Sequence, residues 1–171
     1  ILADARDLGM QKKLNLKIKY RESFRPFAPI VLEEKASDYF EIQQSSPYML
    51  FTTKVRNRKC VQETRGIQDQ LQQCRSDIPA VTHVDYSARL QTVNKEEHAG
   101  LHRILCEFEK LTGCAVMINT SFNVRGEPPV CSPVNALNCF LRTDMDFLSL
   151  GPFWIDKKQL NSDKWNLVSK G

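Results

Sequence analysis

Apolar residues along this chain fall into short runs separated by polar segments, which is the pattern of a β-sheet with helices packed on it. Most of the runs are rich in β-branched or aromatic side chains and therefore favour strands. A shorter segment, Lys17 to Tyr20, alternates polar and apolar residues and also indicates a strand. The predicted strands are 17–20, 30–32, 49–55, 79–84, 89–93, 115–118 and, with an internal turn, 147–155.

The clearest predicted helix spans 95–112, where leucine, isoleucine and phenylalanine recur at helical spacing and Gly113 supplies a stop. A second helix begins after Ser132, an N-cap residue followed by Pro133 in the first turn, and should run to about residue 142. Two shorter helices are expected at 8–16 and 34–40. Because helices are interspersed among more numerous strands, we expect an α/β (α+β) fold with a twisted mixed sheet.

The length of 171 residues and a hydrophobic content of 42% allow a real core and fit one domain better than two. The segment 56–77 is rich in Gln, Arg and Lys, and we interpret it as a surface insertion or mobile hairpin with solvated charge. The polar end after Asp156 is expected to fray. The first residue is Ile1, without a preceding Met, and the start reads as a cut inside a longer protein.

Composition narrows the function classes only mildly. The net charge of +4 suits phosphate ligands but falls short of the footprint of a dedicated nucleic-acid protein. None of the 6 cysteines forms a CxxC pair or a zinc-site spacing, so we expect reduced thiols and a cytoplasmic protein. No signal peptide and no apolar segment of membrane-spanning length is visible, and no membrane partner is expected.

Four basic residues lie within nine positions near the start of the chain. Lys17, Lys19, Arg21 and Arg25 would share one face if an extended strand ran straight through them. Such a row can bind a polyphosphate, since Arg forms bidentate hydrogen bonds and Lys contributes a point charge. The alternative is a solvated face of an edge strand, where Lys blocks aggregation.

A polar loop at 119–129 follows the apolar run 115–118 directly. Its hydroxyls, Thr120 and Ser121, are hydrogen-bond donors, Asn123 can recognise an amide or a purine edge, and Arg125 can balance phosphate charge. A buried strand that ends in such donors presents them to an anionic ligand. The alternative is a structural loop whose Asn and Ser residues cap its own turns.

A turn from Asp85 to Ser87 leads to Arg89 on the next predicted strand. An Arg with a neighbouring Asp forms a surface ion pair more often than it serves a site, so this pattern alone leaves both roles open for Arg89.

The histidines His98 and His102 lie four apart, a spacing that can place two metal ligands on one helix face. The HExxH arrangement is absent and no third ligand is identified. We therefore interpret them as structural or solvent-exposed and predict no metal ligands in this chain. No nucleophile elbow, Walker loop or dinucleotide glycine fingerprint is present.

Five ordered segments together resemble the C-terminal domain of the O-carbamoyltransferase family, which includes nodulation protein U and the antibiotic carbamoyltransferases. The segments are 1–6, 21–29, 79–85, 87–93 and 119–129. The likeness extends from residue 1 to about 157, leaving 158–171 as a polar C-terminal tail. It implies a YrdC-like fold, as in threonylcarbamoyl-adenylate synthases: an open twisted mixed sheet with a concave basic face.

The resemblance also implies a reaction. The domain would bind ATP and carbamoyl phosphate, with Mg²⁺ bridging the triphosphate, and form carbamoyl-adenylate. The carbamoyl group would then pass to an acceptor hydroxyl in an N-terminal domain of the actin-like ATPase type, which holds its own metal. Because negative charge builds on phosphate oxygens, cationic and hydroxyl donors are needed more than a general base.

By resemblance, phosphates and the carbamoyl group would be held by the basic segment and by the polar loop, with one further Arg at the adenylate. The residues implied are Lys19, Arg21 and Arg25, then Thr120, Ser121, Asn123 and Arg125, and finally Arg89. Tyr86 departs from the pattern, since the family usually has Gly at this turn position.

Two alternatives to the enzyme stay open. Relatives of this fold bind tRNA through a basic groove, so an RNA-binding module is one, although a nucleic-acid partner is not expected here. A domain that scaffolds its N-terminal partner without chemistry is the other.

Overall fold

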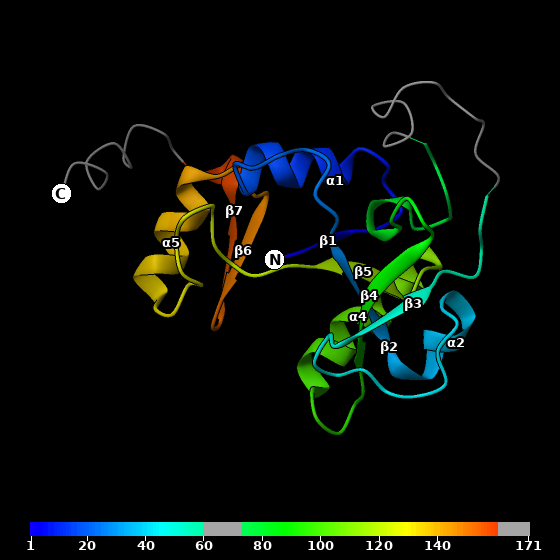
Figure 1. Cartoon of the computed structure of the whole chain (residues 1–171). Coiled ribbons are helices and arrows are strands. Elements are labelled where there is room, and N and C mark those ends of the chain that lie inside the picture. The colour runs from blue at the N-terminus through cyan, green and yellow to red at the C-terminus, as the bar shows by residue number, and fades with distance from the viewer. Residues whose placement is uncertain (60–72, 161–171) are drawn as a thin grey trace. The chain divides into compact units, whose positions relative to one another are not determined.

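The computed structural model describes residues 1–59 and 73–160. It contains a five-stranded mixed sheet, a separate two-stranded sheet and several helices, which confirms the predicted α+β class (Figure 1). The chain divides into two compact units. The first unit holds residues 1–16 and 21–121, and the second holds Lys17–Tyr20 together with the residues from Phe122 onward.

The five-stranded sheet of the first unit has the order β1-β5-β2-β4-β3 (Figure 1). Only the β2–β4 pair is parallel, and the other neighbours are antiparallel. The strands are β1 (Leu2–Asp4), β2 (Ala28–Leu32), β3 (Phe51–Lys54), β4 (Ser87–Val93) and β5 (Val116–Asn119).

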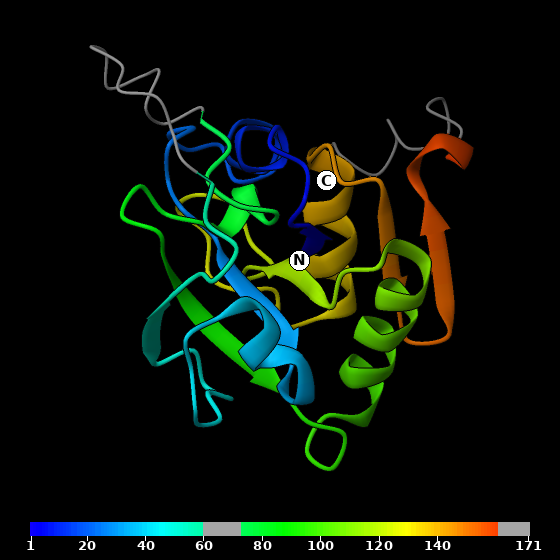
Figure 2. The ribbon, with the colours of Figure 1, turned by 90° about the vertical axis from the view of Figure 1, so that its right-hand side faces the viewer.

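The core of the first unit is centred on β2, in which all five residues are buried. Helix α4 (Ala99–Thr112) packs against β2 and β5 and buries Leu105 completely (Figure 2). Gly113 ends this helix with φ 71°, a left-handed conformation that costs glycine nothing. The predicted stop is therefore confirmed, and the helix begins four residues later than expected.

The second unit is built from helix α5 (Pro133–Arg142) and the antiparallel hairpin of β6 (Phe147–Leu150) and β7 (Phe153–Asp156). The Ser132 side chain accepts a hydrogen bond from the Asn135 N–H, so the predicted N-cap is confirmed. At the other end of the helix, the ammonium of Lys157 donates to the carbonyls of Phe140 and Thr143.

Shorter helical segments connect these elements. Helix α1 (Met10–Lys13) continues into a π-helical turn at Leu14–Ile18, and α2 (Ala36–Tyr39) follows a 3₁₀ turn at Glu33–Lys35. Both agree with helices predicted at 8–16 and 34–40. Among the helices of the described residues, none has both the length and the apolar character that crossing a membrane requires.

The strand predicted at 17–20 is wrong, because the chain is π-helical through Ile18. Leu14 and Ile18 lie four residues apart and are both buried, so burial at helical spacing prevails over the local alternation. The prediction that the basic residues share one strand face fails with it. Lys17 is exposed, whereas Lys19 is only 4% exposed.

The strand predicted at 79–84 is also wrong, since Pro79–Val81 forms a 3₁₀ turn. Pro79 occupies the first turn, where its missing N–H costs nothing. The hydroxyl of Thr82 then donates to the Ile78 carbonyl at 2.9 Å and closes the turn.

Two predicted segments lie partly outside the described residues. The polar insertion at 56–77 includes 60–72, and the C-terminal tail at 158–171 includes 161–171; both of these stretches are outside the described part of the chain.

Tyr86 lies in the turn before β4 with φ 62°, the left-handed region that glycine adopts without strain. We expect Tyr86→Gly to be more stable than Tyr86→Ala by about 1 kcal/mol, because both lose the ring and only alanine keeps the Cβ that strains this conformation. Urea unfolding of the two variants measures the difference. Equal midpoints would contradict the strain.

Candidate functional site

The polar loop predicted as a ligand site begins where β5 ends. Thr120 and Ser121 belong to the first unit, whereas Asn123 and Arg125 belong to the second. The backbone N–H of Thr120 donates to the Ile1 carbonyl at 3.0 Å, which ties the start of the loop to β1. Ser121 is exposed.

In the second unit, Lys19 meets the loop. Its Nζ donates to the side-chain oxygen of Asn123 at 2.8 Å and to the Asn123 carbonyl at 3.1 Å. The Lys19 carbonyl in turn accepts from the Arg125 N–H at 3.1 Å. The structure therefore brings together three of the predicted residues, Lys19, Asn123 and Arg125.

The same loop is closed on itself by its own amide. The Asn123 side chain donates to the Glu127 carbonyl at 2.8 Å, and Gly126 takes φ 81° between them. The Glu127 carboxylate pairs with Arg142 of α5 at 2.9 Å. Asn123 thus has the turn-capping role that the sequence left open, and it also orients the Lys19 ammonium.

In the first unit, Arg21 is held by a residue that the sequence analysis missed. Its Nε donates to Oδ1 of Asn15 at 2.6 Å, and its guanidinium lies 4.8 Å from the centroid of the Phe27 ring. Asn15 is completely buried, and its amide also donates to the carbonyls of Ser23 and Arg25. A polar residue between two leucines, Leu14 and Leu16, is the signal that would have found it.

Arg21 and Arg25 influence each other electrostatically. The pKa of Arg21 is lowered, first by burial and then by the positive charge of Arg25. Glu22 pairs with Arg25 at 3.0 Å and offsets part of this repulsion. The Arg21 guanidinium remains charged at neutral pH, since the ordinary pKa of Arg lies far above it. An anionic ligand beside them would relieve the repulsion.

Arg89 lies at the same end of the sheet as the start of β2. Ile30 of β2 pairs with Gln91 of the parallel strand β4, so two residues earlier Ala28 is level with Arg89. On its other side Ala28 pairs with Asn119 of β5. The small side chain of Ala28 therefore separates an exposed Arg from an amide on one face of the sheet.

That face continues as a polar row that the sequence analysis did not recognise. The Asn119 amide donates to Oε1 of Gln91 at 2.7 Å, and Gln91 donates to the Pro47 carbonyl at 3.0 Å. Side chains alternate between the two faces along a strand, so Arg89 and Gln91, two residues apart on β4, lie on the same face. Asn119 is the last residue of β5 and lies on that face as well. Only the strand register reveals that they are neighbours.

We call this group the sheet-end site and define it as Arg21, Arg89, Asn119, Thr120 and Ser121, all in the first unit. Phe27, over which Arg21 lies, directly precedes β2, and Thr120 directly follows β5. Two guanidiniums, an amide and two hydroxyls can bind phosphate oxygens and a polar heterocycle. None of these groups is an activated nucleophile.

The turn before Arg89 is stabilised by Asp85. Its carboxylate accepts from the hydroxyl of Ser87 at 2.6 Å and from the Ser87 N–H at 3.0 Å, which lowers the pKa of Asp85 to about 2. Asp85 also pairs with Lys54 at 3.4 Å. Asp85 is therefore engaged by Ser87 and Lys54. In the same segment, the pKa of His83 is lowered, mainly by burial.

Comparison with known proteins relates the chain to carbamoyltransferases. A family model described as the carbamoyltransferase C-terminus matches residues 1–157. An uncharacterized protein, sll1178, of Synechocystis is 52% identical over 163 residues, covering 92% of this chain and 26% of that protein. Nodulation protein NolO of Bradyrhizobium diazoefficiens is 37% identical over 172 residues, covering 99% of this chain and 29% of that protein.

Nodulation protein U of Rhizobium tropici is 40% identical over 126 residues, covering 74% of this chain and 19% of that protein. The chain thus spans about a quarter of the length of the relatives it matches.

Removing the Asn123 side chain should destabilise the second unit. Asn123→Ala removes one acceptor, the side-chain oxygen, from the buried Lys19 ammonium, which costs roughly 1–3 kcal/mol. Asn138→Ala, an exposed change on α5 of the same unit, is the matched control and should be neutral or slightly stabilising. Thermal unfolding compares them, and equal destabilisation by both variants would refute a special role for Asn123.

Loss of the Ser87 hydroxyl should raise the pKa of Asp85 from about 2 toward the ordinary 3.8, since this hydrogen bond is its largest cause. Because the folded-state pKa is depressed, ionised Asp85 stabilises the fold above about pH 4 and this contribution disappears as the pH falls through about 2. Carboxyl NMR titration of Ser87→Ala measures the shift. Lys54→Met should raise the pKa less, and the reverse order would contradict the assignment.

Proposed function

The chain belongs to the family of carbamoyltransferase C-terminal domains, and we propose that it binds ATP and carbamoyl phosphate and forms carbamoyl-adenylate. The observation that carries the proposal is the sheet-end site, where Arg21 and Arg89 lie at the end of the sheet from which Thr120 and Ser121 emerge. Cationic groups at the same end of a sheet suit a polyphosphate better than a neutral ligand.

The repulsion between Arg21 and Arg25 supports an anionic ligand further. Two guanidiniums close enough to lower one pKa create a field that a phosphate neutralises. The bond that Arg21 donates to Asn15 holds the guanidinium in one orientation, so little side-chain entropy is lost when a ligand binds. We propose Arg21 and Arg25 for the phosphates and Arg89 for the adenylate.

The proposed reaction requires stabilisation of negative charge that develops on phosphate oxygens. Water first hydrolyses carbamoyl phosphate to carbamate and phosphate. A carbamate oxygen then attacks the α-phosphorus of ATP, and pyrophosphate leaves. Negative charge builds on phosphate oxygens during this step, and Arg and hydroxyl donors stabilise it. Thr120 and Ser121 supply such hydroxyls. We also propose, as the family resemblance implies, that the phosphate and carbamoyl groups are bound by Lys19, Asn123 and Arg125.

Mg²⁺ fits this site as an ion carried by the substrate. The one carboxylate of the segment 21–25 is Glu22, which is paired with Arg25. Within the described residues, the one group of three side chains suited to a metal is Glu34, His102 and Cys106, which belongs to the opposite end of β2. When bound, Mg²⁺ would bridge the triphosphate and neutralise part of its charge.

Transfer to an acceptor hydroxyl is proposed for the longer protein. Its relatives extend well beyond this chain, and an N-terminal domain of the actin-like ATPase type, with its own metal, would choose the acceptor. This chain would then supply the activated carbamoyl group and the partner domain would consume it.

The decisive experiment is calorimetric titration of a non-hydrolysable ATP analogue and of carbamoyl phosphate. Arg21→Ala should weaken binding of the ATP analogue roughly 10- to 100-fold, because a charge-assisted contact contributes about 1.5–3 kcal/mol. Arg103→Ala, which removes the same charge from the exposed face of α4, is the matched control and should bind as the unchanged chain does.

Ser121→Ala should weaken binding less than Arg21→Ala, as expected for a neutral donor. Equal binding by the unchanged chain, Arg21→Ala and Ser121→Ala would refute the site. Tight RNA binding with a steep salt dependence, combined with a melting temperature that ATP does not change, would favour the RNA-binding alternative instead.

A further inference from the structure

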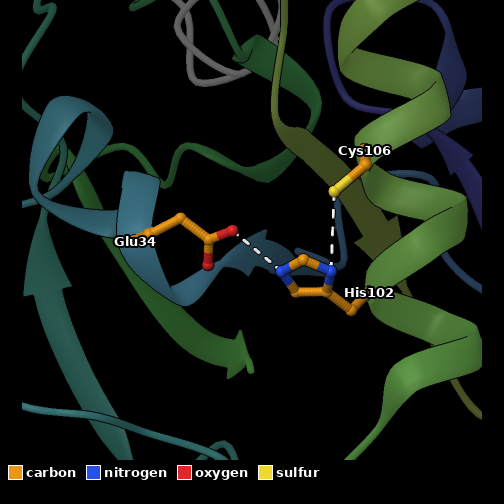
Figure 3. Close-up of side chains that lie close together, drawn as sticks. All are labelled: Glu34, His102 and Cys106. Carbon is orange, nitrogen blue, oxygen red and sulfur yellow. Dashed lines mark hydrogen bonds and ion pairs between the residues drawn. The ribbon is translucent and has the colours of Figure 1, made fainter. Parts of the chain in front are cut away.

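A glutamate, a histidine and a cysteine from two separate segments meet beside helix α4 (Figure 3). His102 and Cys106 lie one turn apart on α4, and Glu34 lies in the turn that directly follows β2. Their ligand atoms all lie within 4.8 Å of one another. All three residues belong to the first unit, at the end of β2 opposite the sheet-end site.

The His102 ring lies between the other two side chains and contacts each with a different nitrogen (Figure 3). Nε2 lies 2.8 Å from the Glu34 carboxylate, and Nδ1 lies 3.5 Å from the Cys106 sulfur. A carboxylate only accepts, so a neutral ring donates through Nε2–H and its Nδ1 lone pair faces the thiol. The carboxylate thus selects the tautomer whose free nitrogen points toward sulfur.

This arrangement matches a metal-binding histidine. Such a histidine usually donates its second ring N–H to a carboxylate, which fixes the ring and increases its basicity. Zinc takes sulfur at about 2.3 Å and nitrogen at about 2.0–2.1 Å, so a tetrahedral ion holds the two atoms about 3.5 Å apart. The distance between Nδ1 and Sγ is 3.5 Å without any movement.

The donor types restrict the ion. Imidazole with thiolate selects zinc and related late transition metals, whereas Mg²⁺ and Ca²⁺ prefer oxygen ligands. The His102 side chain is only 13% exposed, so its position is fixed by packing, whereas Glu34 at 52% stays in contact with water. Cys106 is itself partly exposed, so solvent can deliver an ion to the sulfur and occupy the positions that the protein leaves open.

We propose that His102 Nδ1 and Cys106 Sγ bind a divalent zinc-class ion, and that Glu34 orients His102 by accepting its Nε2–H. On binding, the thiol proton leaves to solvent, the sulfur forms a bond to the ion as a thiolate, and water completes the coordination. The His102–Glu34 bond already links α4 to the turn after β2, and a bound ion would reinforce it by fixing the His102 ring. This site is independent of the nucleotide function proposed above.

Cobalt(II) titration of the whole chain tests the site, because a thiolate bond to this ion gives a charge-transfer absorption that carboxylate and imidazole do not give. We expect one equivalent to bind with this absorption and zinc to displace it. Cys106→Ser and His102→Ala should abolish the absorption. Glu34→Gln should keep it but weaken zinc binding about 10-fold, as expected when the partner of a ligating histidine changes.

Two matched controls separate this site from unspecific binding. Cys131→Ser removes an exposed cysteine of the second unit, and His98→Ala removes the other histidine of the pair at four-residue spacing; neither should change the titration. Absorption that persists in Cys106→Ser, or that is lost in Cys131→Ser or His98→Ala, would overturn the proposal.

A second measurement needs no mutation and avoids the risk that a variant fails to fold. Iodoacetamide labelling followed by mass spectrometry reports each cysteine separately. With zinc present, Cys106 should label at least 10-fold more slowly, while exposed Cys131 should label at an unchanged rate. Equal labelling of Cys106 with and without zinc would refute metal binding at this position.

Discussion

Strand β2 is the element on which the rest of the first unit depends, and Pro29 determines how it pairs. All five residues of β2 are buried, with β5 antiparallel on one side and β4 parallel on the other. Pro29 has no N–H to donate, and the ladder with β4 starts one residue later, at Ile30. The two strands are therefore not paired where Ala28 is level with Arg89. The β2–β4 ladder therefore does not reach the sheet end where the cationic and amide side chains gather, although β2 stays paired with β5 there.

Much of the fold could be predicted wherever one local signal decides the structure. Ser132 with the proline after it defines the start of α5, and Gly113 ends α4, because caps and left-handed glycines act within a single turn. The alternation at 17–20 misled because the burial that opposes it comes from tertiary packing of Leu14 and Ile18. Pro79 lies in a turn because the Val81 N–H donates to the Ile78 carbonyl, a 3₁₀ hydrogen bond that composition does not reveal.

The candidate site was predictable in its residue types and less so in its arrangement. Arg21, Arg89 and Ser121 could be chosen from charge and position, but Asn119 joins Arg89 only through the shared neighbour Ala28, which strand order determines. Asn15 was missed because its role is to hold Arg21, which lies six residues further along the chain and beyond the π-helical turn that carries Asn15. Lys19 bonds to Asn123, a contact that the sequence did not predict, and the strand expected at 17–20 does not form.

The same dependence on β2 explains why a second cluster exists at all. Residues 33 and 34 follow the strand directly, and α4 packs along it, so Glu34 and His102 are brought together by the packing that buries β2. The four-residue spacing of His98 and His102 allows two ligands on one helix face, but the sequence identifies no third ligand and we predicted no metal ligands. The groups that approach His102 are instead Cys106 and Glu34. A five-residue strand is about 16 Å long, so the two ends of β2 are too far apart for an ion bound at Cys106 to touch a nucleotide at Arg89. The cluster can therefore influence the sheet-end site only through the position of β2 itself.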